Sequence, residues 1–103
     1  MEGRQFQFEW DEGKARQNVR KHGVSFELAR TVFHDPHLLT VADLEHSEFE
    51  EGWASIGRLS NGALLSVVYL WLSGDSEVAK VRLISARRAT LSEIRYYQVG
   101  IHE

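Results

Sequence analysis

The dipeptide Asn61-Gly62 is the feature that most constrains the fold of this chain. It separates two stretches with strand-like composition, residues 53–60 and 63–72. Asn-Gly readily takes the two left-handed conformations of a type I′ turn, and such a turn joins neighbouring antiparallel strands. The sequence therefore predicts a β-hairpin at the centre of the chain, with these two stretches as its strands.

Apolar and polar residues alternate in two further stretches, which predicts additional strands. In residues 5–10 aromatic side chains alternate with polar ones, the period-two pattern of a half-buried strand. Residues 78–86 alternate as well, with Lys80 and Arg82 opposite the apolar positions, and residues 38–42 form a shorter extended stretch. These strands flank the central hairpin on both sides in the chain.

Capping residues predict two helices before the hairpin. Asp11 is a candidate N-cap for a short basic helix, and Gly23 supplies its C-terminal stop. Ser25 is a candidate N-cap for a second helix, which Pro36 ends. We therefore expect two consecutive helices between the first and second strands.

Thr90 and Glu93 have the spacing of a capping box, which predicts a third helix near the C-terminus. The order of elements is then a strand, two helices, a run of strands and a helix. This order predicts an α+β fold: a single domain over residues 1–103, built on an antiparallel meander with two N-terminal helices and one C-terminal helix packed on it.

Composition excludes several classes of function. The chain has 103 residues and no cysteine, which rules out a disulfide scaffold, a thiolate zinc site and a cysteine nucleophile. His34 and His37 flank a proline that breaks helical geometry, and no ligand cluster lies nearby, so we expect neither a metal site nor a cofactor. Residues 63–72 are shorter than the roughly 20 residues of a membrane span, and no secretory signal is visible, so we expect a cytoplasmic protein.

The charges are unevenly distributed along the chain. The net charge is −3 at pH 7, but residues 35–77 carry one basic and eight acidic side chains, whereas residues 78–103 carry five basic and two acidic ones. Residues 1–34 are nearly balanced. The basic C-terminal quarter leaves a nucleic-acid partner open despite the acidic average.

Basic residues in two groups are candidates for contacting a phosphate backbone. The planar fork of arginine matches phosphate oxygens, and a charged side chain such as Arg82 on a central strand is costly unless it is paired or functional. Basic residues on a short helix are more often simply solvated, so that alternative stays open for the first group. The two groups are Lys14, Arg16, Arg20, Lys21 and His22, and Lys80, Arg82, Arg87, Arg88 and Arg95.

His22 has two interpretations. It can change charge near neutral pH and so could serve as a general acid or base. Directly before Gly23, it could equally interact with the last carbonyl groups of its helix.

Two motifs carry a family resemblance. They are Lys21-His22-Gly23-Val24-Ser25-Phe26 and Arg82-Leu83-Ile84-Ser85-Ala86-Arg87, and matching positions extend over nearly the whole chain. In order and spacing these motifs resemble the BrnT family of type II toxin-antitoxin toxins.

The resemblance implies a small ribonuclease toxin with a RelE-like fold, which cleaves RNA without a metal and inhibits translation. It also implies a partner: a BrnA-like antitoxin with a ribbon-helix-helix end, in a hetero-oligomer that binds operator DNA through the antitoxin. Carried over by position, the functional basic residues are Lys21, Arg82 and Arg87, and His22 belongs to the same motif.

Cleavage by the 2′-hydroxyl of RNA needs proton transfer and cations that stabilise the charge on the phosphorane. Our hypothesis is that Arg82 and Arg87 hold the scissile phosphate and that Lys21 contacts the RNA backbone or assists proton transfer. Other basic residues expected to bind RNA are Arg20, Lys80 and Arg88. Glu50 and Glu51 are weaker candidates for the base.

Two positions depart from the family pattern. Gly52 and the segment Leu70-Trp71-Leu72 stand where family members usually carry arginines. The chain could therefore be a catalytically weakened member that acts mainly as an antitoxin-binding co-repressor of its own operon. Alternatively, the apolar segment Leu70-Trp71-Leu72 could be an enlarged partner-binding surface.

Overall fold

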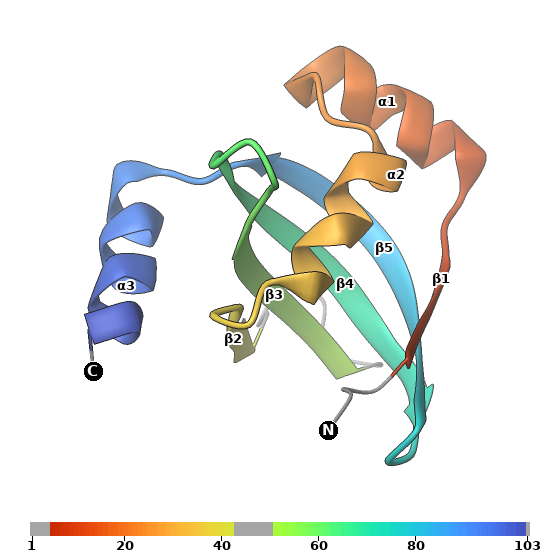
Figure 1. Cartoon of the computed structure of the whole chain (residues 1–103). Helices are drawn as coiled ribbons and strands as arrows, with labels where there is room; N and C mark the ends of the chain where they lie inside the picture. Colours follow the sequence, from red (N-terminus) through yellow and green to blue (C-terminus); the bar gives the residue numbers. More distant parts are fainter. Residues whose placement is uncertain (1–4, 43–50, 103) are drawn as a thin grey trace.

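The structure is a computed structural model that describes residues 5–42 and 51–102. Its described strands form one mixed sheet in the order β1-β5-β4-β3-β2 (Figure 1). An α+β fold is therefore confirmed. The elements are β1 (Gln5–Glu9), α1 (Glu12–His22), α2 (Phe26–Ala29), the 3₁₀ helix η1 (Arg30–His34), β2 (Leu39–Ala42), β3 (Glu51–Arg58), β4 (Leu64–Gly74), β5 (Val78–Arg88) and α3 (Leu91–His102).

The first strand departs from the predicted meander. β2, β3, β4 and β5 are antiparallel neighbours, but β1 pairs in parallel with β5, with Glu9 opposite Arg82. The prediction of an all-antiparallel sheet is therefore wrong for β1. Alternation identifies a strand but carries no information about its partner, which here lies 73 residues further along the chain.

The central hairpin forms, but its turn differs from the predicted one. The Leu59 amide donates to the Ala63 carbonyl at 2.8 Å, and the Gly62 amide donates to the Leu59 carbonyl at 2.9 Å. Gly62 has a φ of 93°, whereas no described non-glycine residue has a positive φ, so the turn is not type I′. Asn61 instead accepts a hydrogen bond from the Ala63 amide through its side chain, which stabilises a three-residue loop with a left-handed glycine.

The N-terminal helices begin and end at predicted residues, with one difference. Asp11 caps α1 by accepting from the Lys14 amide at 2.9 Å, and Gly23 ends α1 with a φ of 70°. Ser25 caps α2, but α2 is only one turn long and continues as the tighter η1. The Thr31 hydroxyl donates to the Leu28 carbonyl at 2.7 Å, a local hydrogen bond of the kind that competes with regular α-helix.

The helices are unequally attached to the sheet. α2 and η1 cross one face, where Phe26 of α2 packs in one core with sheet side chains such as Val67 and Leu83, while α1 lies against β5 (Figure 1). α3 lies beside the sheet, and its buried contact is Tyr97, whose hydroxyl donates to Asp35 at 2.6 Å. The C-terminal helix therefore packs on the sheet much less than predicted, and Tyr96 is 69% exposed.

A bulge in β5 decides which side chains share a face of the sheet. Strict alternation would place Arg82 and Arg87 on opposite faces because they are an odd number of residues apart. However, Ile84 is an extra residue, since the register with β4 shifts between Val68 and Tyr69. The partners of Arg82, Ser85 and Arg87 are Leu70, Val68 and Ser66, which alternate along β4. All three β5 residues therefore lie on the face opposite α2 and η1, which we call the outer face.

Candidate functional site

The outer face of β5 carries a row of polar side chains, Lys80, Arg82, Ser85 and Arg87, which we call the β5 row. The register with β4 and the bulge at Ile84 place its members on one side of the sheet. The structure thus brings Arg82 and Arg87, both predicted from sequence, onto one surface.

Arg82 is paired with a carboxylate from the neighbouring strand. Its Nε and Nη2 atoms both lie 2.7 Å from Oε2 of Glu9, and Lys80 Nζ lies 3.7 Å from Oε1 of the same residue. The hydrogen bond from Arg82 lowers the pKa of Glu9, and Lys80 adds to this effect, although partial burial opposes it. Nη1 of Arg82 makes no hydrogen bond to any described residue, so one edge of the guanidinium is open.

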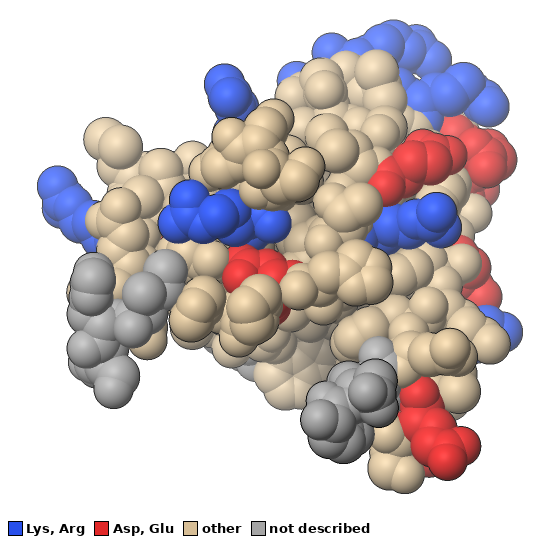
Figure 2. Space-filling view, in the orientation of Figure 1, with Lys and Arg blue, Asp and Glu red and all other residues tan. Residues whose placement is uncertain are grey.

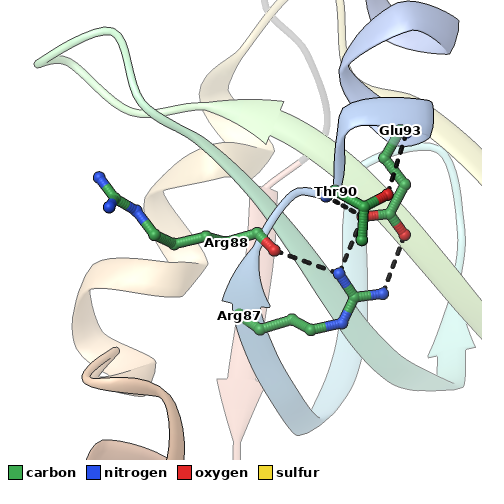
Figure 3. A network of polar contacts seen from close by, with 4 residues as sticks. All are labelled: Arg87, Arg88, Thr90 and Glu93. Carbon is green, nitrogen blue, oxygen red and sulfur yellow. Dashed lines mark hydrogen bonds and ion pairs between the residues drawn. The ribbon is translucent and has the colours of Figure 1, made fainter.

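Arg87 is held by a second carboxylate, in a network shown in Figure 3. Its Nη1 and Nη2 atoms donate to the two oxygens of Glu93 at 2.8 and 2.9 Å, and Nη1 also donates to the Arg88 carbonyl. Glu93 accepts from the Thr90 amide as well, which completes the predicted capping box. Glu93 raises the pKa of Arg87, while the Arg87 hydrogen bond lowers the pKa of Glu93.

Lys21 and His22 line a shallow groove between α1 and β5. The groove has a volume of about 230 Å³, and its β5 wall is the bulge itself, Ile84 and Ser85. Lys14 contributes to the groove from the first turns of α1. Figure 2 shows that lysine and arginine side chains gather over α1. The structure therefore places Lys21 and His22 next to the segment of β5 that joins Arg82 to Arg87.

The remaining predicted residues are less closely connected. Arg20 is exposed on α1 and does not line the groove, and the Arg88 side chain points away from Glu93 (Figure 3). Lys80 is a member of the β5 row, and its Nζ lies 3.7 Å from Oε1 of Glu9. Glu50 and the side chain of Glu51 lie outside the described part of the chain.

Asn18 supports the site and was not predicted as a site residue. Its side chain is 5% exposed and makes three hydrogen bonds: it donates to the carbonyls of Val24 and Ala86 at 2.8 Å, and accepts from the Ala86 amide at 3.0 Å. Asn18 thus fastens α1 to β5 immediately after the bulge. A polar residue three positions after Ala15, on the buried side of an amphipathic helix, is the sequence signal that indicates such a role.

The segment Leu70-Trp71-Leu72 does not form one exposed patch. Leu70 is 9% exposed on the outer face, opposite Gly52. Trp71 lies on the other face, where it lines an aromatic pocket of about 320 Å³ with Phe33, Tyr69 and other residues. The three residues therefore do not form the single apolar patch expected from the sequence, because consecutive strand residues point to opposite faces.

The described residues contain no helix with the length and apolar character needed to cross a membrane. Within the same ranges, no group of three histidine or acidic side chains is gathered in a way that could hold a metal ion.

Comparison with known proteins agrees with the fold and identifies its class. A crystal structure of the Brucella abortus ribonuclease toxin BrnT is similar to this chain, with a TM-score of 0.57 and 23% identity over 84% of this chain and 97% of that one. No curated protein matches the chain. The sequence model of a family described as "Ribonuclease toxin, BrnT, of type II toxin-antitoxin system" matches residues 10–93. The chain therefore belongs to the BrnT family of ribonuclease toxins.

Proposed function

We propose that this chain is a metal-independent endoribonuclease that cleaves RNA and thereby inhibits translation. The observation that supports this most is the β5 row: the bulge at Ile84 gathers Arg82 and Arg87 on one face, beside the groove that Lys21 and His22 line. Cations fixed on strands can stabilise the charge that develops on a phosphorane.

Each of the predicted site residues has a proposed role in RNA binding or cleavage. Arg82, with its open Nη1, binds the scissile phosphate, and Arg87 adds charge from the same face. Lys21 contacts the RNA backbone and His22 takes part in proton transfer. Arg20, Lys80 and Arg88 extend the RNA-binding surface.

We further propose that a BrnA-like antitoxin with a ribbon-helix-helix end neutralises this chain in the cytoplasm. The hetero-oligomer would bind operator DNA through the antitoxin, and the fold would be RelE-like. Family membership supports an antitoxin partner. Co-purification with the product of an adjacent small gene tests this, and failure of the two chains to associate would contradict it.

The function is tested by adding the purified chain to a cell-free translation reaction and to bare RNA in EDTA. We expect RNA fragments in both cases, with 2′,3′-cyclic phosphate ends. Intact RNA in both reactions at high concentrations of the chain would contradict ribonuclease activity. Cleavage only in the presence of a divalent cation would contradict the metal-independent mechanism.

One observation favours a second candidate, a weakened toxin that acts mainly as a co-repressor. Both arginines of the β5 row are engaged by carboxylates, Glu9 and Glu93. If this candidate is correct, induced expression without the antitoxin leaves growth unchanged, while the complex still binds operator DNA. Growth arrest would favour the ribonuclease.

A further inference from the structure

Glu9 contacts two cations of the β5 row but has no role in the function proposed above. Its Oε2 accepts from Nε and Nη2 of Arg82, and its Oε1 faces Lys80. Register fixes this position, because Glu9 lies directly opposite Arg82 in the parallel β1-β5 ladder. The side chain is 35% exposed, so the carboxylate is accessible to a ligand on the outer face.

RNA cleavage by the 2′-hydroxyl places a geometric demand on the base. The hydroxyl is next to the scissile phosphate, so the base must lie beside the cation that holds this phosphate. Glu9 meets the demand because its carboxylate occupies the Nε edge of Arg82, while Nη1 makes no hydrogen bond to any described residue. A phosphate can therefore bind the open edge of the guanidinium with the carboxylate alongside.

We propose that Glu9 is the general base that deprotonates the 2′-hydroxyl of bound RNA; this inference rests on the ribonuclease function proposed above. Glu9 takes the hydroxyl proton as the bond from O2′ to phosphorus forms. The bond from phosphorus to the 5′ oxygen breaks, and that oxygen takes a proton from His22, which is the part in proton transfer proposed for His22 above. Water then reprotonates His22. The products are a 2′,3′-cyclic phosphate and a 5′-hydroxyl, and Glu9 returns its proton to solvent.

The charged groups near Glu9 keep its carboxylate ionised, which is the form that a general base needs. Arg82 and Lys80 face it from β5, and Asp11 and Glu12 follow it in the chain. Because the two cations lower its pKa, the carboxylate is ionised at neutral pH. The cleavage rate should therefore fall as the pH drops through the lowered pKa of Glu9, and a variant without this carboxylate should lack that fall.

The test compares Glu9→Gln with Glu77→Gln on the RNA that the wild-type chain cleaves. Glu77 is exposed just before β5, so its substitution removes the same charge away from the β5 row. We expect Glu9→Gln to lower kcat about 100-fold, in the usual range for a general base, with a smaller change in KM. It should also remove the acidic limb of the pH profile, while Glu9→Asp restores part of the activity and Glu77→Gln matches the wild type.

Three outcomes would overturn the inference. If Glu9→Gln cleaves at close to the wild-type rate, Glu9 is not the base, although the ribonuclease function stands. If only KM rises and the pH profile is unchanged, Glu9 merely positions Arg82. If the wild-type chain cleaves neither bare RNA nor translated RNA, the proposed function fails and this inference fails with it. Thermal unfolding of each variant shows whether the loss comes from misfolding.

Discussion

The two arginine–glutamate pairs on β5 look alike but are built differently. Both arginines lie on the outer face, with side chains 43% and 41% exposed. Glu93 also accepts from the Thr90 amide, so the pair it makes with Arg87 belongs to the start of α3. Among the described residues, the Glu9 carboxylate accepts hydrogen bonds from Arg82, and Lys80 Nζ lies 3.7 Å from it. The comparison shows that one pair belongs to a helix cap, while the other caps no helix and leaves Nη1 of Arg82 without a hydrogen bond to a described residue.

The sharpest test of this difference is to remove each arginine in turn. Arg82→Ala should lower kcat/KM for RNA cleavage about 100-fold or more, the usual effect of losing a preorganised donor to transition-state charge. Arg87→Ala should lower it by roughly 10-fold, because Glu93 already occupies both Nη atoms of Arg87, whereas Nη1 of Arg82 makes no hydrogen bond to a described residue. Cleavage assays at one salt concentration measure both effects. If Arg87→Ala lowers kcat/KM more than Arg82→Ala does, then Arg82 is not the main phosphate-binding arginine.

Asn18 supports the strand segment between the two pairs, so its removal should affect both. Asn18→Ala leaves the amide and carbonyl of Ala86 without their partner, and we expect a loss of about 3 kcal/mol in the free energy of unfolding. The matched control is Gln17→Ala, on the exposed side of the same helix. Urea denaturation measures the change. Equal stability of the two variants would show that Asn18 does not hold β5.

The next test compares how much each arginine–glutamate pair contributes to the stability of the fold. Glu93→Ala removes a helix cap and an ion pair that solvent partly screens, so unfolding should become easier by about 1 to 2 kcal/mol. Glu9→Gln should leave the Tm nearly unchanged, because its pair caps no helix. Calorimetry of the two variants, with Gln98→Ala as the control on α3, distinguishes them. Greater destabilisation by Glu9→Gln would break the comparison.

The smallest expected effect is on pH dependence. Hydrogen bonds from Arg87 and the Thr90 amide lower the pKa of Glu93 below its ordinary 4.5, although burial opposes them. The unfolded chain therefore binds more protons, so this contribution is present above pH 4.5 and is lost as pH falls through the folded pKa. Wild type should lose more stability than Glu93→Gln between pH 7 and pH 3.5 in urea titrations. An equal loss of stability in the two proteins over this pH range would contradict the expectation. Asp35 titrates in both proteins, so its contribution to the pH dependence of stability cancels when the two are compared.

Local signals predicted local structure well. Asp11, Gly23 and the Thr90-Glu93 capping box each mark a helix boundary, because a cap depends on residues three or four positions apart. What the sequence could not provide was pairing over long distances. The Glu9–Arg82 contact depends on the parallel register of β1 and β5. Arg82 and Arg87 share a face because of a bulge in β5, and the amino-acid composition of that strand does not reveal the bulge.

The site itself was predicted only in part, for the same reason. Lys21, His22, Arg82 and Arg87 came from motifs in the sequence, and the structure gathers them around β5. Asn18 could have been recognised as a polar residue on a buried helix face. Glu9 could not, because alternation in β1 identifies it only as a solvent-facing strand residue.

The parallel pairing of β1 with β5 has a consequence for the order of synthesis. β1 leaves the ribosome before the other described strands of the sheet, yet its partner β5 is the last of these strands to be made. Long-range pairing of this kind must await the later segment, so β1 stays without its neighbour until β5 has emerged. Glu9 and Arg82 therefore meet only after β5 has emerged.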